Sequence, residues 1–136
     1  MNGRSRAARV LATLGSIALL ASAAMHWMAY QKFSAPAVRA SNLPQALQSV
    51  FELAFLSMAW TWIVIAVLVL VVTFGEGRLR KPIALICGFA VLIQAVFTVP
   101  FVGFFVGNEV IGAASVLIIL GGFLFSRSAG SPFPDL

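Results

Sequence analysis

This sequence contains few charged residues. Only 10% of its 136 residues are charged and 61% are hydrophobic, whereas a soluble domain carries about 25% charged and about 45–50% apolar residues. This composition excludes a soluble enzyme and a disordered chain. Four membrane spans of about 20 residues would use roughly 80 residues, close to what the hydrophobic fraction supplies. We therefore predict an all-α integral membrane protein, a single membrane domain over residues 1–136 with four transmembrane helices.

The sequence also contains only one cysteine and one histidine. Cys87 is the single cysteine and lies inside an apolar run, so an intramolecular disulfide and a CxxC redox pair are both excluded. His26 is the single histidine, which excludes a haem held by two histidines of one chain. The chain contains no HExxH or ExxH pattern of metal ligands. The sequence accordingly predicts no catalytic residue, no metal site and no cofactor.

Four apolar runs are separated by segments rich in loop-forming residues. The expected spans cover about 8–30, 46–74, 82–100 and 108–126, and a flexible tail is expected over 127–136. Residues 31–48 contain Pro36 and Pro44 and are predicted to form the longest loop, while Pro100 is predicted to end or kink the third span. The first run contains the A-x-A cleavage pattern of a signal peptide, but its apolar character continues to Tyr30, which favours an uncleaved helix.

Basic residues are distributed unevenly between the predicted loops. The N-terminal tail carries three, the turn at 75–81 carries three and the C-terminal tail carries one, which makes seven on one side against Lys32 and Arg39 on the other. Cytoplasmic loops of membrane proteins carry the excess of Lys and Arg. We therefore predict a bacterial inner-membrane protein with both termini in the cytoplasm. We attribute the net charge of +5 to the basic loops that set the orientation of the chain in the membrane. The lipid bilayer is therefore the expected partner, and nucleic acid is not.

Small residues recur at a spacing close to 3.5 residues along the predicted spans. Ala84, Cys87 and Val91 form such a stripe in the third span, and Gly112 and Gly122 belong to one in the fourth. Small residues let membrane helices approach closely, and this repeat is typical of left-handed packing. The pattern predicts an up-down-up-down bundle.

Polar side chains inside or beside the spans gather towards the predicted outward side. The candidates for binding a ligand or handling a proton are His26, Glu52, Gln94, Asn108, Glu109 and Trp60. Three of them also have an ordinary structural role: Asn108 can cap the fourth helix, Glu109 can complement its dipole, and Gln94 can bond a neighbouring helix. We expect His26 to form an ion pair with Glu52 near the outer interface.

Two hypotheses for function follow. The first is a non-enzymatic accessory or structural subunit that binds a membrane protein partner or a second copy of itself, because catalytic groups are scarce. The alternative is a small transporter or ligand-binding bundle whose outward polar cluster receives a proton, a cation or a quinone-like molecule. The length and four spans resemble those of small multidrug-resistance transporters, but these carry a glutamate in the first span and this chain has none there.

Overall fold

Four long helical segments make up the part of the chain that the computed structural model describes, residues 3–103 and 106–125. The described residues form helices and turns and no strand. Four segments are long and apolar enough to cross a membrane: residues 3–39, α3, α4 and α5, as the composition predicted. The elements in chain order are α1 (Gly3–Ala29), a π-helical segment η1 (Tyr30–Ser34), α2 (Ala35–Arg39), α3 (Gln45–Phe74), α4 (Arg80–Val102) and α5 (Val106–Leu124).

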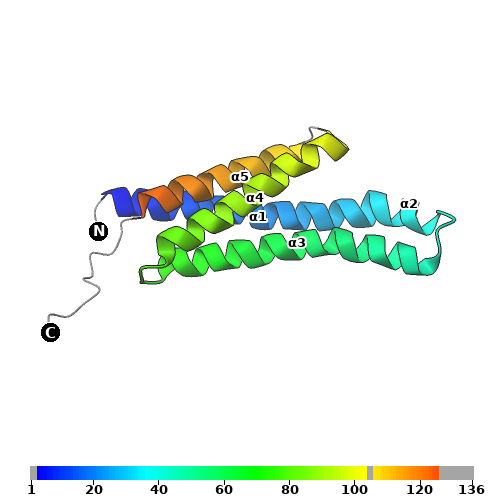
Figure 1. Cartoon of the computed structure of the whole chain (residues 1–136), viewed down its shortest axis with the longest axis horizontal. Helices are drawn as coiled ribbons and strands as arrows, with labels where there is room; N and C mark the ends of the chain where they lie inside the picture. The colour runs from blue at the N-terminus through cyan, green and yellow to red at the C-terminus, as the bar shows by residue number, and fades with distance from the viewer. Residues whose placement is uncertain (1–2, 104–105, 126–136) are drawn as a thin grey trace.

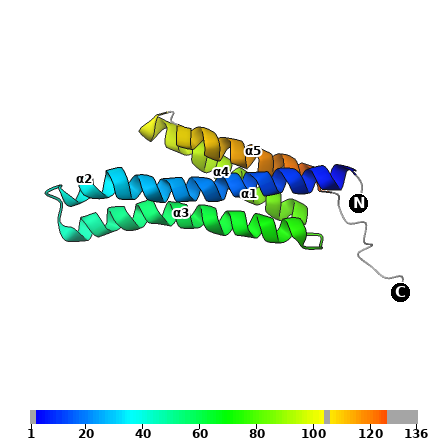
Figure 2. The same cartoon turned by 180° about the vertical axis from the view of Figure 1, so that it is seen from behind.

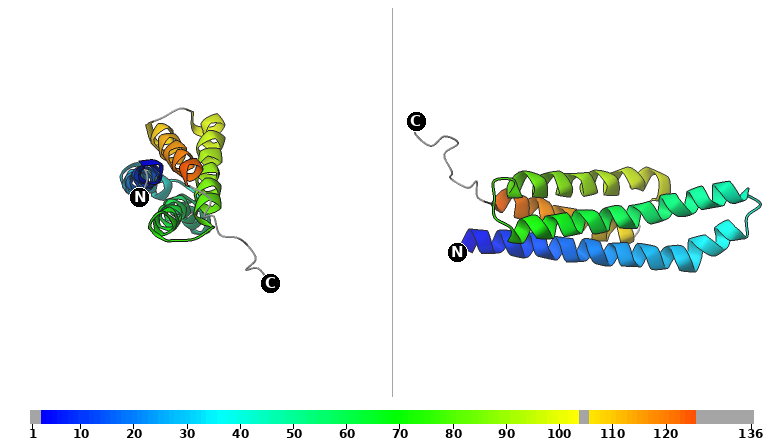
Figure 3. Two further views of the ribbon diagram at one scale, coloured as in Figure 1. Left: turned by 90° about the vertical axis from the view of Figure 1, so that its left-hand side faces the viewer. Right: turned by 90° about the horizontal axis from the view of Figure 1, so that it is seen from below.

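The helices run alternately in opposite directions (Figure 1). The start of α1 and the end of α5 therefore lie at the same end of the molecule, as the view from behind also shows (Figure 2). α1 packs closely against both α3 and α5, and α4 packs closely against α5, whereas α3 and α4 contact each other much less. The views along and below the bundle show the same arrangement (Figure 3). The weakly packed α3–α4 side is where the candidate site lies.

The long loop predicted over residues 31–48 is wrong, because the chain stays helical to Arg39 and the connection to α3 spans only residues 40–44. Pro36 is the second residue of α2, but α1, η1 and α2 follow one another without a break. Its missing N–H and its ring would therefore disturb a regular α-helix through this region. The preceding turn widens: the Ala35 N–H bonds to the Tyr30 carbonyl, five residues back. Single π-turns of this kind occur inside α-helices where the regular hydrogen-bond ladder is disturbed. As a result α2 and the start of α3 extend beyond α4 and α5 (Figure 1).

The connection between α4 and α5 is also shorter than expected. Pro100 does not end α4, which continues to Val102. A proline this close to a helix end removes only one backbone hydrogen bond. The helix stops at Gly103, whose φ of 73° is accessible to glycine at little cost, and its N–H bonds to the Val99 carbonyl. The tail predicted over 127–136, and residue 126 of the last span, lie outside the described residues.

α5 is packed between α1 and α4, and glycines lie at its contacts with both helices. A Cβ atom added to Gly15 of α1 would lie 2.7 Å from the Ala114 carbonyl oxygen, and one added to Gly121 would lie 2.9 Å from the Ala12 nitrogen. On the other side, a Cβ at Gly122 would lie 2.9 Å from a Leu85 methyl group. The backbones therefore approach as closely as small residues allow. The single stripe predicted for this helix misses the face that carries Gly121, and Gly112 has open space around it.

Arg80 fastens α3 to α4 at the end of the molecule that carries the termini. Its Nε and Nη2 groups donate hydrogen bonds of 3.0 and 2.9 Å to the carbonyls of Val72 and Thr73, and its guanidinium lies 4.7 Å from the centre of the Phe125 ring. The last carbonyls of a helix lack intrahelical partners, so these bonds satisfy the end of α3. α3 and α4 are thus joined at this end, and the cavity lies towards the other.

Candidate functional site

A cavity of about 300 Å³ lies between α3 and α4, near the end away from the termini. All four long helices contribute to its wall. α3 supplies most of the lining, α4 and α5 supply the opposite side, and α1 contributes His26. The lining residues are His26, Phe51, Ala54, Phe55, Met58, Trp62, Gln94, Ala95, Thr98, Asn108 and Ile111.

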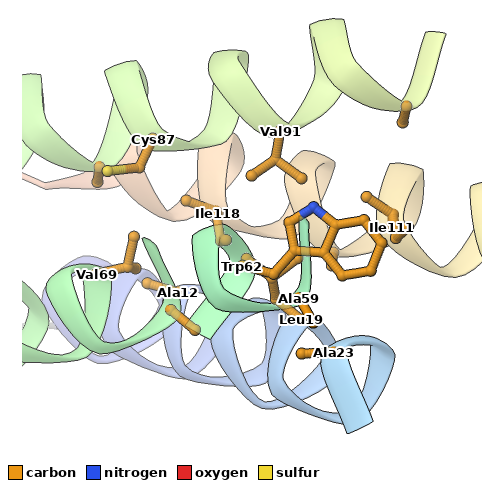
Figure 4. Packing of buried hydrophobic residues seen from close by; sticks show 14 of the residues in the cluster. Ala12, Leu19, Ala23, Ala59, Trp62, Val69, Cys87, Val91, Ile111 and Ile118 are labelled. Carbon is orange, nitrogen blue, oxygen red and sulfur yellow. The ribbon is translucent and has the colours of Figure 1, made fainter. Parts of the chain in front are cut away.

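Trp62 and Gln94 form the main polar contact across this cavity. Trp62 is only 3% exposed, and its Nε1–H donates a hydrogen bond of 2.9 Å to Gln94 Oε1. The indole reaches from α3 towards Val91 of α4 and Ile111 of α5, with its nitrogen on the α4 side (Figure 4). Because an indole N–H can only donate, the contact decides which end of the carboxamide faces Trp62. The Gln94 NH₂ group has no partner among the described residues, and it can donate to a molecule in the cavity.

His26 connects the cavity to α1. Its Nε2 lies 3.0 Å from the Phe55 carbonyl oxygen, and since a carbonyl only accepts, Nε2 carries the proton and Nδ1 is the acceptor of the neutral ring. The imidazole stacks on Phe55 with ring centres 4.6 Å apart and meets the edge of Trp62 at 5.1 Å. A second cavity of about 210 Å³ lies on the α1–α5 side. His26, Trp62 and Ile111 line both cavities and separate them.

Asn108 joins α5 to α4 and is not the helix cap that the sequence predicted. α5 begins two residues earlier, at Val106, so Asn108 lies inside its first turn and is 7% exposed. Thr98 Oγ1 lies 3.2 Å from Asn108 Oδ1, and Asn108 Nδ2 donates to the Gly103 carbonyl at 3.2 Å. The side chain reaches back to α4 because the connection is so short. Thr98 Oγ1 is also 2.9 Å from the Ala95 carbonyl, so its single proton serves one acceptor at a time.

The predicted ion pair between His26 and Glu52 is wrong. No ion pair joins these two side chains in the described part of the chain, and the polar partner of His26 is the Phe55 carbonyl. Glu52 is half-buried and lies about one turn before Phe55 in α3. The sequence predicts a similar depth for the two residues, near the outward ends of their spans. The His26 ring instead stacks on Phe55, which lies three residues after Glu52.

The remaining candidates also lie outside the cavity. Glu109 is exposed in the first turn of α5, as predicted, and lines an outer groove between α4 and α5 together with Pro100. Trp60 is 59% exposed and lines a groove between α1 and α3 together with Trp27. The structure therefore brings His26, Gln94 and Asn108 to one cavity and leaves Glu52, Glu109 and Trp60 elsewhere.

Two lining residues were missed as candidates, Trp62 and Thr98. Thr98 is four residues after Gln94, so it lies on the same face of α4, and a buried tryptophan generally needs a partner for its N–H. These signals were available in the sequence. Among residues 3–103 and 106–125, no group of three or more His, Cys, Asp or Glu side chains could hold a metal ion. Comparison of the chain with protein families, curated proteins and solved structures found no match.

Proposed function

We propose that the chain crosses the cell membrane four times, as a left-handed bundle with both termini in the cytoplasm. Four helical segments of sufficient length and apolarity support the crossing, and the uneven distribution of basic residues supports the orientation. The cavity then lies in the outward half of the bilayer, because it is near the end opposite the termini. The 37-residue first segment would measure about 55 Å at 1.5 Å per residue, so its end projects beyond the roughly 30 Å hydrocarbon core or the helix tilts.

Within this bundle, the protein binds a small, mostly apolar ligand in the cavity between α3 and α4. The observation that carries this proposal is a cavity walled by all four helices with a few polar groups converging on it, which is the usual character of a small-molecule site. Transport of a proton or cation is less well supported, because no carboxylate of the described residues lines the cavity. Towards the termini the buried core also consists largely of apolar side chains such as Ala12, Val69 and Ala84.

Filling the cavity tests this function. Ala54 is an exposed residue that lines it, and Ala24 is an exposed residue that lines the separate groove beside Trp60. Ala54→Phe and Ala24→Phe therefore make the same change at two places. The wild type and both variants would be purified in lipid nanodiscs, and the molecules retained by each would be extracted and identified by mass spectrometry. We expect a molecule that is retained by the wild type and by Ala24→Phe and lost from Ala54→Phe; identical retention by all three proteins would contradict the proposal.

The second candidate function, an accessory subunit of a membrane assembly, is favoured by the helices that extend beyond α4 and α5. This part of the molecule exposes large apolar side chains, including Phe33 at 66%, Val50 at 59% and Leu53 at 70%. A partner subunit could cover them. Purification in mild detergent with identification of co-purifying proteins tests this function, and Val50→Lys should release a partner that binds there. A protein that purifies alone from native membranes under several gentle conditions would contradict it.

A further inference from the structure

The chemistry of the cavity restricts the ligands that it can take. Its polar groups are the side-chain amides of Gln94 and Asn108, the hydroxyl of Thr98, the imidazole of His26 and the N–H of Trp62. The rest of the lining is aromatic or aliphatic, apart from the thioether of Met58. Neither a carboxylate nor a Lys or Arg side chain of the described residues contributes to the wall. A charged ligand would therefore lose its hydration without gaining a counter-charge. The ligand must be neutral, and the Gln94 NH₂ group matches an acceptor oxygen such as a carbonyl.

The place where the cavity opens restricts how a ligand reaches it. α3 and α4 contact each other much less than the other adjacent pairs, and the lining residues Phe51 and Ala54 of α3 are exposed. Phe51 is 52% exposed, so it stands at the mouth of the cavity. The opening is therefore sideways, between two helices long and apolar enough to cross the membrane. A molecule dissolved in the bilayer can use this route.

We propose that the ligand is a lipid-soluble molecule with a neutral, carbonyl-bearing ring of the quinone type, whose ring enters the cavity from the bilayer between α3 and α4. This inference rests on the ligand-binding function proposed above. One ring carbonyl accepts a hydrogen bond from Gln94 Nε2, the ring lies against the aromatic side chains of Phe55 and Trp62, and the apolar tail leaves past Phe51. The volume of about 300 Å³ is at the lower limit for small-molecule sites and holds a substituted ring without its tail.

The three tryptophans of the chain provide a direct readout. Trp62 lines the cavity, whereas Trp60 and Trp27 line the groove between α1 and α3. One protein would keep only Trp62 (Trp27→Phe, Trp60→Phe) and the matched control would keep only Trp60 (Trp27→Phe, Trp62→Phe). Each would be reconstituted in nanodiscs and titrated with decylubiquinone, a benzoquinone with a ten-carbon tail, while its fluorescence is recorded. We expect saturable quenching of Trp62 and only linear, partition-type quenching of Trp60.

Two substitutions in the Trp62-only protein locate the binding. Ala54→Phe should abolish the saturable phase. Gln94→Met keeps the size of the side chain but removes its donor, and it should weaken the apparent affinity about two- to tenfold, as expected for one hydrogen bond. Both variants should elute and show helical circular dichroism as the parent does. Saturable quenching of equal strength for Trp60, or quenching of Trp62 that Ala54→Phe leaves intact, would overturn the proposal.

Competition with decylbenzene separates the ligand class from the ligand-binding function. This molecule has the same tail and a ring of similar size without carbonyl groups. We expect it to displace decylubiquinone poorly. If it competes equally well, or if decylubiquinone does not bind while the extraction experiment recovers another molecule that Ala54→Phe excludes, the quinone assignment fails and the ligand-binding function stands.

Discussion

The Nε1–H of Trp62 on α3 and the side-chain oxygen of Gln94 on α4 are joined by a hydrogen bond of 2.9 Å across the adjacent helices that pack least closely. α5 is held to α1 and α4 by close contacts at glycines and to α4 also by the hydrogen bond between Thr98 and Asn108. Between α3 and α4 of the described chain, the main polar connections are the Trp62–Gln94 bond and the Arg80 contacts at the opposite end. The bond therefore supports the wall of the cavity and at the same time orients the amide that faces into it.

Removing both partners of this hydrogen bond should cost less than the sum of the costs of removing each one alone. Gln94→Met leaves the buried Trp62 N–H without an acceptor and should lower the free energy of unfolding by about 1–3 kcal/mol. Trp62→Phe leaves only the more accessible amide unpaired. In the double variant the loss should be smaller than the sum of the two single losses. Denaturation in detergent micelles, followed by helical circular dichroism, measures all three; additive losses would show that the bond does not contribute.

Two glycines of α5 should respond in opposite ways to the same substitution. In Gly121→Ala the new methyl group would lie 2.9 Å from the Ala12 nitrogen and 3.0 Å from the Ala8 carbonyl oxygen, so α1 and α5 must separate, at a cost of about 1–3 kcal/mol. Gly112→Ala meets nothing within 4 Å and should be neutral or stabilising, because alanine is favoured over glycine in helices by about 1 kcal/mol. Thermal unfolding in detergent compares them. Equal stability of the two variants would contradict the close packing of α1 on α5.

His26 should be energetically coupled to Phe55 and not to Glu52. The imidazole stacks on the Phe55 ring at 4.6 Å, and aromatic pairs contribute about 0.5–1.5 kcal/mol beyond the area they bury. A double-mutant cycle of His26→Ala with Phe55→Leu should show a coupling of this size, whereas His26→Ala and Glu52→Gln should be additive. Both cycles use unfolding in detergent. Coupling in the Glu52 cycle and none in the Phe55 cycle would reinstate the ion pair that the sequence suggested.

Cysteine labelling tests the proposed orientation. Cys87 is buried, so the native chain should react poorly with a membrane-impermeant maleimide and can serve as the background. Asn42→Cys places a thiol in the connection between α2 and α3, and Glu76→Cys places one in the turn between α3 and α4, both at exposed positions. In intact bacterial spheroplasts we expect labelling of Asn42→Cys alone, with Glu76→Cys labelled after permeabilisation. The reverse pattern would place the termini outside.

Much of the helical architecture could be predicted from composition and run length. Long apolar runs can satisfy their backbone polar groups only within the segment, which makes a helix the expected structure, and the four helical segments lie where the apolar runs are. On α4 the predicted stripe is confirmed, since Ala84, Cys87 and Val91 are all buried. Boundaries were predicted less well: the chain stays helical through Pro36, and α4 continues beyond Pro100 to Val102.

The candidate site could be predicted from the sequence less well than the helices, because it depends on how the helices pack against one another. The sequence by itself determined that polar groups are few and that His26, Gln94 and Asn108 lie towards one end of the chain's helices. It did not determine rotation or register between helices, so it points to Trp60 and Glu52, whereas the structure places Trp62 and Phe55 at the cavity. Side chains two residues apart on a helix, such as Trp60 and Trp62, point in directions about 200° apart, and only packing against a neighbour selects which one is buried. The glycine contacts of α5 fix that packing, and the weaker contact between α3 and α4 leaves the cavity.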